Sequence, residues 1–315
     1  MKKLILLPMA ALVAFAAVSC EVDNNPVQKD KPADEGGGEV TTPLFPAGTD
    51  IVEGIAQPKG ALKSIEISYF NESSTTVIWD KSLQTIIYDE LGRPMREDVL
   101  YYNYVDGVDQ GTTRTGGSTL YVYAPGKIEV QYKYSNGEVI VLRKLELNSD
   151  GLVDIADNGS DKWQYTYNGG KCTGKKKLSG GNKLRDMEYA WNSDASLYSA
   201  KEQWNGPANP DEDGSEYYNY TSDIENPTYK QAYDVSGIVF SDVGDLGGYY
   251  FNGLGSSKLP SSVRTTFRNE GKVFTYQITK SGLLVKITRK VWPFADDDPM
   301  AKNFQYREYR LSYYN

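Results

Sequence analysis

The chain has 315 residues, with 34 lysines and arginines against 42 acidic residues and a net charge of −8. An acidic chain argues against nucleic acid as a partner, because binding nucleic acid needs a basic surface. The sequence has no histidine, which excludes Ser-His-Asp and Cys-His catalysis in their usual forms and removes the commonest ligand of catalytic zinc. Carboxylate, lysine and tyrosine chemistry remain open.

Residues 1–19 are predicted to be a lipoprotein signal peptide. Two lysines follow the initial methionine, and the apolar run after them is too short for a comfortable membrane span. The run ends at Ala17-Val18-Ser19-Cys20, which resembles the lipobox of bacterial lipoproteins, with Ala17 where that family usually has Leu. The resemblance implies that Cys20 carries a lipid and becomes the mature N-terminus. An ordinary signal peptide with an incidental cysteine is the alternative.

Residues 20–58 are predicted to be a disordered tether. They are rich in proline, glycine and charged residues and poor in apolar ones, so they cannot bury a core. Fully extended, the tether would reach on the order of 100 Å, at roughly 3.3 Å per residue. Acidic residues just after Cys20 resemble the export signal of surface-exposed lipoproteins in Bacteroides-type bacteria. We therefore expect a lipid-anchored protein of the outer membrane and cell envelope, with exposure at the cell surface as a further expectation.

Residues 59–315 are predicted to form one antiparallel β domain. Short runs alternate with period two, as in residues 127–134, where Ile128, Val130 and Tyr132 share a face. Asn, Asp and Gly tolerate the positive φ that tight hairpins need. Turn signals of this kind lie at residues 89–92, 135–137, 148–151, 168–170, 192–194 and 280–282. Consecutive hairpins without room for crossovers predict a meander.

Tyr88-Asp89-Glu90-Leu91-Gly92-Arg93 resembles the core of the YD repeats in bacterial shell-forming toxins. Shared hairpin chemistry is the preferred explanation, because there is one good copy. Together with residues 147–153 and 253–260, this motif resembles a family of Bacteroides-type lipoproteins of unknown function, over roughly Ile65 to Tyr314. The resemblance implies a large, curved, porin-like antiparallel sheet in the cell envelope and transfers no catalytic residue.

The predicted fold is all-β, a long curved antiparallel meander present as a single-layer sheet or an unclosed barrel. The Gly-rich stretch 244–255 lacks the Lys-Ser/Thr ending of a phosphate loop, so we expect a loop tucked against the concave side near residues 241–260. An integral membrane barrel needs an outward apolar band. The runs carry Lys, Glu and Gln on one face, which disfavours that arrangement.

Residues 209–214 imitate the start of a calcium loop. Asn209, Asp211 and Asp213 would supply oxygens at alternate positions. Tyr220 stands where the bidentate glutamate should be, so Glu216 would have to replace it in a different geometry. A solvated acidic loop is the preferred interpretation and a calcium site is the alternative. No other cofactor is expected.

Tyrosine is the strongest compositional anomaly, with 25 copies. Aromatic side chains on a sheet either pack across strands or offer a platform for sugar rings. We prefer packing for most of them. The candidates for a ligand platform are Trp163, Trp191, Trp204 and Trp292.

The leading hypothesis is a non-catalytic envelope lipoprotein that binds an extracellular ligand such as a glycan, or an envelope protein. One alternative is a carboxylate-dependent polysaccharide hydrolase, and another is an adhesion or structural module. With 42 acidic residues, spacing in the sequence nominates no catalytic pair, so no catalytic residue is predicted.

Overall fold

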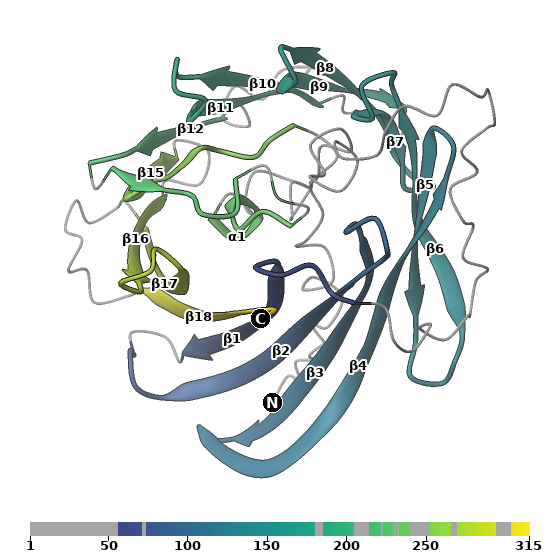
Figure 1. Ribbon diagram of the computed structural model, residues 1–315. Helices are drawn as coiled ribbons and strands as arrows, with labels where there is room; N and C mark the ends of the chain where they lie inside the picture. The colour runs from purple at the N-terminus through teal and green to yellow at the C-terminus, as the bar shows by residue number, and fades with distance from the viewer. Residues whose placement is uncertain are drawn as a thin grey trace, which may run out of the picture.

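The computed structural model describes residues 56–70, 74–179, 185–204, 214–221, 223–229, 231, 233–239, 253–265, 270–293 and 304–315. Within these ranges, sixteen strands form one closed antiparallel barrel, which Figure 1 shows along its axis. The barrel strands are β1 (Leu62–Phe70), β2 (Ile78–Tyr88), β3 (Pro94–Val105), β4 (Val108–Ala124), β5 (Lys127–Lys133), β6 (Val139–Leu147), β7 (Val153–Asp157), β8 (Lys162–Asn168), β9 (Lys171–Ser179), β10 (Arg185–Trp191), β11 (Leu197–Trp204), β12 (Gly214–Asn219), β15 (Ser262–Thr265), β16 (Glu270–Ile278), β17 (Leu284–Pro293) and β18 (Gln305–Tyr313).

The first and last strands close the barrel. Ile65 of β1 pairs with Leu311 of β18, and the Ser64 and Ser312 hydroxyls lie 2.7 Å apart although 248 residues separate them. The prediction of a single-layer sheet or unclosed barrel is therefore wrong. Closure removes both free sheet edges, which are otherwise sites of unwanted pairing. Barrel closure depends on one pairing between the first and last strands. The alternation of apolar and polar residues shows only which face of a strand is buried, so it could not reveal that pairing.

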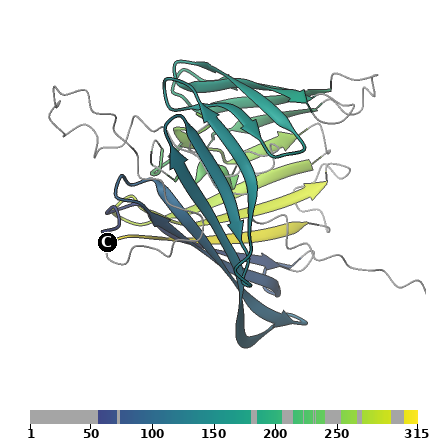
Figure 2. The same cartoon turned by 90° about the vertical axis from the view of Figure 1, so that its right-hand side faces the viewer.

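The two ends of the barrel differ, and we name them by what they carry. The plug end carries the start of β1, the end of β18, and the turns at 89–93, 148–152, 192–196 and 279–283. The far end carries the turn at 158–161 and the tip of the ribbon formed by β3 and β4. This ribbon projects beyond its neighbours (Figure 2), because β4 pairs with β5 only from Ser118 onward.

The predicted hairpin turns are confirmed, and five of the six share a common geometry. In the turn at 89–93, the Asp89 N–H donates to the Arg93 carbonyl at 2.8 Å, and Gly92 has a φ of 74°. A positive φ suits glycine because it has no Cβ. The same bond pattern recurs at 134–138, 148–152, 192–196 and 279–283. At 192–196 the positive-φ position is Ala195, with a φ of 64°, so the turn is strained there.

The two faces of the wall have opposite polarity. Inward side chains such as Ile65, Tyr121 and Ile287 are buried in a continuous apolar core. The outer face carries ion pairs instead: Lys81–Glu66 at 2.9 Å, Arg96–Asp98 at 2.6 Å and Lys286–Glu308 at 2.6 Å. The interior is therefore largely apolar, although it also buries the charged residues Glu97, Lys175 and Lys272, and the outer face carries partly exposed ion pairs.

Tyrosine hydroxyls tie neighbouring strands together at the plug end. Tyr88 at the end of β2 donates to the Leu62 carbonyl at the start of β1, at 2.8 Å. The same bond recurs from Tyr123 to Pro94, Tyr167 to Val153, Tyr220 to Leu197, Tyr276 to Pro260 and Tyr313 to Leu284. Each hydroxyl pairs a backbone carbonyl that would otherwise need water. These hydrogen bonds at the plug end account for part of the high tyrosine content.

The chain between β12 and β15 enters the barrel, and we call its described residues, 223–229, 231, 233–239 and 253–261, the plug. It contains the two-stranded sheet β13 (Ile224–Glu225) and β14 (Lys258–Leu259) and the short helix α1 (Ser236–Val239). Figure 1 shows α1 inside the ring of strands, and Tyr233, Val235 and Leu259 are buried there. Of the loop predicted to tuck in near residues 241–260, residues 241–252 lie outside the described part.

Candidate functional site

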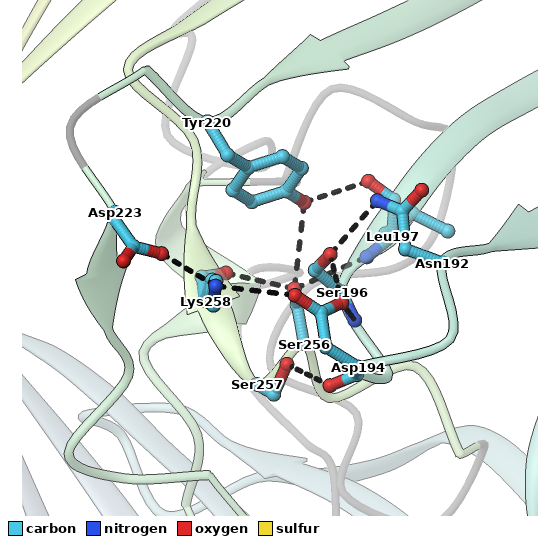
Figure 3. Close-up of polar contacts among 9 residues, drawn as sticks. All are labelled: Asn192, Asp194, Ser196, Leu197, Tyr220, Asp223, Ser256, Ser257 and Lys258. Carbon is cyan, nitrogen blue, oxygen red and sulfur yellow. Dashed lines mark hydrogen bonds and ion pairs between the residues drawn. The ribbon is translucent and has the colours of Figure 1, made fainter.

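The plug is attached to the turn between β10 and β11, as Figure 3 shows. Lys258 on β14 forms an ion pair with Asp194 at 3.2 Å and another with Asp223. The Asp194 carboxylate also accepts hydrogen bonds from the Ser196 hydroxyl at 2.6 Å and the Ser196 N–H at 3.0 Å. These hydrogen bonds from Ser196, with Lys258 nearby, lower the pKa of Asp194 to about 2. The carboxylate is therefore charged at any physiological pH.

Three hydroxyl groups complete this attachment. Tyr220 donates to the Leu197 carbonyl at 2.6 Å, and Ser256 accepts from the Leu197 N–H at 3.2 Å and donates to the Lys258 carbonyl at 2.7 Å (Figure 3). Ser257 donates to the Asp194 carbonyl at 2.6 Å. The strained turn at Ala195 thus lies where the plug docks, and its carbonyl accepts the Ser257 N–H at 3.2 Å.

A buried polar network holds the plug together internally. The Asn226 amide donates to Asp234 at 2.6 Å, to the Ser236 hydroxyl at 2.9 Å and to the Ser256 carbonyl at 2.9 Å. Burial raises the pKa of Asp234 above its ordinary value. A Cβ added to Gly255 would lie 2.6 Å from Asp234 Oδ2, so the backbone passes directly over this carboxyl group. Most polar atoms of this network are paired within the plug, but Asp234 Oδ2 is buried without a hydrogen-bond partner among the described residues.

Trp191, on barrel strand β10, contacts residues that hold the plug to the wall. Its indole N–H donates to the Cys172 carbonyl at 2.7 Å, and the Lys171 ammonium lies 4.8 Å from the centre of its ring. The same ammonium donates to the Gly255 carbonyl of the plug at 2.7 Å. The neighbouring Cys172 thiol is fully buried, which raises its pKa to about 12 and keeps it protonated despite Lys175.

Trp163 lies on the inner face near the far end, next to two lysines. Across β8 and β9, Trp163 pairs with Lys177 and Tyr165 with Lys175, so all four side chains share the inner face. The ammonium groups of Lys175 and Lys177 lie 4.5 Å and 5.7 Å from the centre of the Trp163 ring. Lys177 also pairs with Asp161 of the 158–161 turn at 2.6 Å.

The indole N–H of Trp163 has no acceptor among the described residues, although the side chain is only 8% exposed. A buried donor without a partner carries a desolvation penalty of about 1–3 kcal/mol. Native proteins contain few such groups, and each one calls for an explanation. We therefore take Trp163, Lys175, Lys177 and Asp161 as the candidate site.

The tryptophans predicted to form a ligand platform do not lie together in the fold. Trp163 and Trp191 face inward near opposite ends of the barrel. Trp292 lies on the outer face, where its ring packs against Gly271. The side chain of Trp204 lies outside the described residues. Ligand binding by these tryptophans stays a prediction, and the two lysines beside Trp163 were missed, although their spacing of two in a strand places them on one face.

Glu216, the last residue of the predicted calcium site, already has partners within the barrel. It faces inward from β12, pairs with Lys272 at 2.9 Å and accepts a hydrogen bond from Tyr218 at 2.7 Å. Asn209, Asp211 and Asp213 lie outside the described residues, as does Cys20. Within the described part of the chain, no group of three or more acidic, cysteine or histidine side chains is arranged to hold a metal ion.

Glu97 is a buried carboxyl that the sequence did not single out. It faces inward from β3, and Tyr121 and Gln84 donate hydrogen bonds to its two oxygens. Burial raises its pKa to about 8, and these two hydrogen bonds only partly oppose the rise. The adjacent Asp98 faces outward, where it pairs with Arg96. The two carboxyls therefore do not face each other across a common site.

Comparison with solved structures shows the fold of this chain. A porin-like protein from Bacteroides uniformis superposes with a TM-score of 0.55 and 11% identity, covering 82% of this chain and 100% of that one. A porin-like protein from Bacteroides vulgatus gives a TM-score of 0.47 and 13% identity over 81% of this chain and 98% of that one. No protein-family model matches the chain, and no curated protein sequence is similar to it. No helix among the described residues has the length and hydropathy to cross a membrane.

Proposed function

We propose that this protein is a non-catalytic binding module of the cell envelope, a barrel that stands in water and is held to the outer membrane by a lipid on Cys20. The observation that carries the proposal is the outer face of the wall, which carries charged side chains in ion pairs around a plugged and largely apolar interior. A pore-forming barrel needs the reverse arrangement, a polar lumen and an apolar outer band.

The charges on the outer wall support placing the barrel in water rather than in the bilayer. A lysine or arginine on the lipid face of a barrel is unfavourable by about 2–4 kcal/mol at the bilayer centre. Lys81, Arg96 and Lys286 all lie on the outer face of the strands, each paired with a carboxylate. Ion pairs near the surface change stability in water by only about 0–1 kcal/mol, so these partly exposed pairs are well tolerated there. The porin-like architecture would therefore serve here as a water-exposed scaffold.

The predicted leader and tether support an envelope location. A lipid on Cys20 followed by a flexible segment would hold the barrel close to a membrane without inserting it. The acidic residues after Cys20 favour the cell surface. The B. uniformis structure that shares the fold is described as a porin-like protein.

A binding role fits the described carboxyl groups better than the hydrolase alternative does. Glycoside hydrolysis uses two carboxyls that face the same bond. The Glu97 carboxyl accepts hydrogen bonds from Tyr121 and Gln84. Asp234 is buried within the plug, and Glu216 forms an ion pair with Lys272. The far end, in contrast, carries the Trp163 indole N–H, which has no acceptor among the described residues.

Limited proteolysis of native membranes tests the proposal. Trypsin should cut the tether after Lys29, because Lys31 is followed by Pro32, which blocks cleavage. If the barrel stands in water, the barrel fragment should move to the supernatant while the lipidated N-terminal peptide stays in the membrane pellet. If the cleaved barrel stays in the membrane pellet after an alkaline wash, the barrel is embedded in the bilayer and the proposal is overturned. Fatty-acid labelling of wild type and a Cys20→Ala variant tests the anchor separately.

A further inference from the structure

We propose that the β3–β4 ribbon and the adjoining start of β2 bind a neutral polysaccharide, with Trp79 as the aromatic contact. This inference rests on the proposed binding function and names the class of its ligand. It places the ligand on the exposed rim of the far end rather than beside Trp163, whose side chain is buried. We call this area the ribbon surface, and it consists of Val77, Trp79 and residues 105–115.

A β-bulge places Trp79 in solvent. Between the pairs Tyr69–Asp80 and Phe70–Ile78, strand β2 has one more residue than strand β1, and this extra residue is Trp79. Bulges at the rims of barrels re-aim a side chain. Trp79 is 50% exposed, more than any other tryptophan that the structure describes. Since tryptophan is amphipathic and contributes large contact areas at interfaces, its exposure here indicates a surface that receives a ligand.

Apolar side chains at the tip of the ribbon extend the surface around Trp79. Val105 and Val108 pair across the tip, and both are more than half exposed. Val77, two residues before Trp79, is also exposed and packs against Gly107 of the same tip, where an added Cβ would lie 2.7 Å from the Val77 Cγ1 atom. The exposed apolar groups of β2 and of the tip therefore form one patch, which marks a binding surface rather than scattered exposure.

The strand that leads away from the tip supplies neutral hydrogen-bonding groups. Residues 108–115 of β4 are all exposed. Their hydroxyl and amide side chains both donate and accept hydrogen bonds, as the hydroxyl groups of a sugar do. The charged groups are Arg114, Asp109 and, at the tip, Asp106, so an anionic polymer gains no net attraction and a neutral one is favoured. The uncharged polar side chains are those of Gln110, Thr112, Thr113 and Thr115.

The size and position of the ribbon surface favour a polymer that approaches from the surrounding medium. Strand β4 pairs with β5 only from Ser118 onward, so the ribbon stands clear of β5 (Figure 2). The exposed stretch of β4 spans about 25 Å at roughly 3.3 Å per residue, which is long enough for several sugar units. Gln57 donates to the Tyr88 carbonyl at the plug end, so the predicted tether would join the barrel there and direct the ribbon away from the anchor.

Affinity electrophoresis with matched variants tests the ribbon surface. Purified full-length protein in non-ionic detergent is run in native gels that contain dextran, mannan, xyloglucan or polygalacturonate, and the retardation gives the dissociation constant. We expect at least one of the three neutral polymers to retard the protein and polygalacturonate not to. Trp79→Ala should weaken binding about tenfold, because it removes the largest apolar contact. Trp79→Phe keeps an aromatic ring and should weaken binding by less than about threefold.

Tyr198→Ala is the matched control, because Tyr198 is also 50% exposed but lies on β11, away from the ribbon. This variant should be retarded like wild type, and urea denaturation checks that all variants are folded. Unchanged retardation of Trp79→Ala would overturn the inference, and so would retardation by polygalacturonate alone or by none of the polymers. Binding to phosphatidylcholine vesicles in place of the neutral polymers would make the patch a membrane contact and equally overturn it. Release of the barrel by trypsin does not depend on these outcomes, so failure here leaves the water-exposed barrel in place.

Discussion

The two ends of the barrel use the same residue types for different purposes. Each end has an inward tryptophan with lysine over its ring, Trp191 at the plug end and Trp163 at the far end. The Trp191 N–H is satisfied by the Cys172 carbonyl at 2.7 Å, whereas the Trp163 N–H has no acceptor among the described residues. The difference teaches that an aromatic residue is informative about function only once its polar atom has been accounted for.

The same contrast extends to the surrounding polar groups. At the plug end, tyrosine hydroxyls, Ser256 and Asn226 all bind backbone or side-chain partners within the fold. At the far end, Lys177 pairs with Asp161, whereas the Trp163 N–H has no acceptor among the described residues. A structural end should lose stability when its polar groups are removed, and a binding end should lose affinity instead.

The largest effect is expected from Asn226→Ala in the plug. The substitution removes the donor to Asp234, Ser236 and the Ser256 carbonyl, leaving several buried groups unpaired. We expect the free energy of unfolding in urea to fall by about 3–5 kcal/mol. Asn103→Ala is the matched control, because Asn103 makes one exposed bond to Thr112 on the β3–β4 ribbon. A loss below about 1 kcal/mol for Asn226→Ala would mean that the polar network of the plug contributes little to stability.

The next effect is a pH dependence of stability caused by Glu97. Its pKa is raised to about 8 in the folded barrel, mainly by burial, against an ordinary value of 4.5. Below pH 4.5 the carboxyl is protonated in both folded and unfolded chains. Between pH 4.5 and about 8 only the unfolded chain ionises, so stability falls as pH rises, by an amount on the order of 3 kcal/mol.

Glu97→Gln removes this ionisation and should flatten that part of the profile. The measurement is the difference in unfolding free energy between variant and wild type at pH 5 and pH 8. This difference should move in favour of the variant as pH rises. Asp234 also has a pKa raised by burial, but it is present in both proteins and cancels. Glu129→Gln on the outer face is the control, and a difference that stays constant with pH would contradict the assignment.

A direct comparison of the two tryptophans comes next in size. Trp191→Phe leaves the Cys172 carbonyl without its donor and should lower the unfolding free energy by about 1–2 kcal/mol. Trp163→Phe removes a donor that has no partner, so its stability should change by less than about 0.5 kcal/mol or increase slightly. Urea denaturation of both variants measures this. If Trp163→Phe proves the more destabilising, the two ends do not differ as described.

The sequence predicts the strands and turns of this fold well, because both depend on neighbouring residues. Alternation in residues 127–134 and the Asn-x-x-Gly turn at 148–151 report local geometry directly. Closure could not be predicted, since it depends on the pairing of Ile65 with Leu311, far apart in the chain. A strand at the edge of an open sheet and one at the seam of a barrel show the same alternation.

The candidate site was predicted only in part. Trp163 was selected by residue type together with Trp191 and Trp292, and nothing in the local sequence separates them. Their roles are set by what the fold brings near each N–H: the Cys172 carbonyl for Trp191, and two lysines for Trp163. The raised pKa of Glu97 is likewise a result of burial under Tyr121, which no spacing in the sequence reveals.

The smallest effect is expected on the outer wall, between the two ends, and it tests the medium around the barrel. Lys286 pairs with Glu308 at 2.6 Å, and Arg310 pairs with the same carboxylate at 2.7 Å. In water, Lys286→Gln should therefore lower the unfolding free energy by less than about 1 kcal/mol, and about 1 M salt should reduce the loss further. A wall embedded in lipid should respond in the opposite direction, because removing a charge from the apolar phase relieves a penalty of about 2–4 kcal/mol. The sign of this small change, measured by urea denaturation of the protein in its native membranes at low and high salt, distinguishes a barrel in water from one in a bilayer.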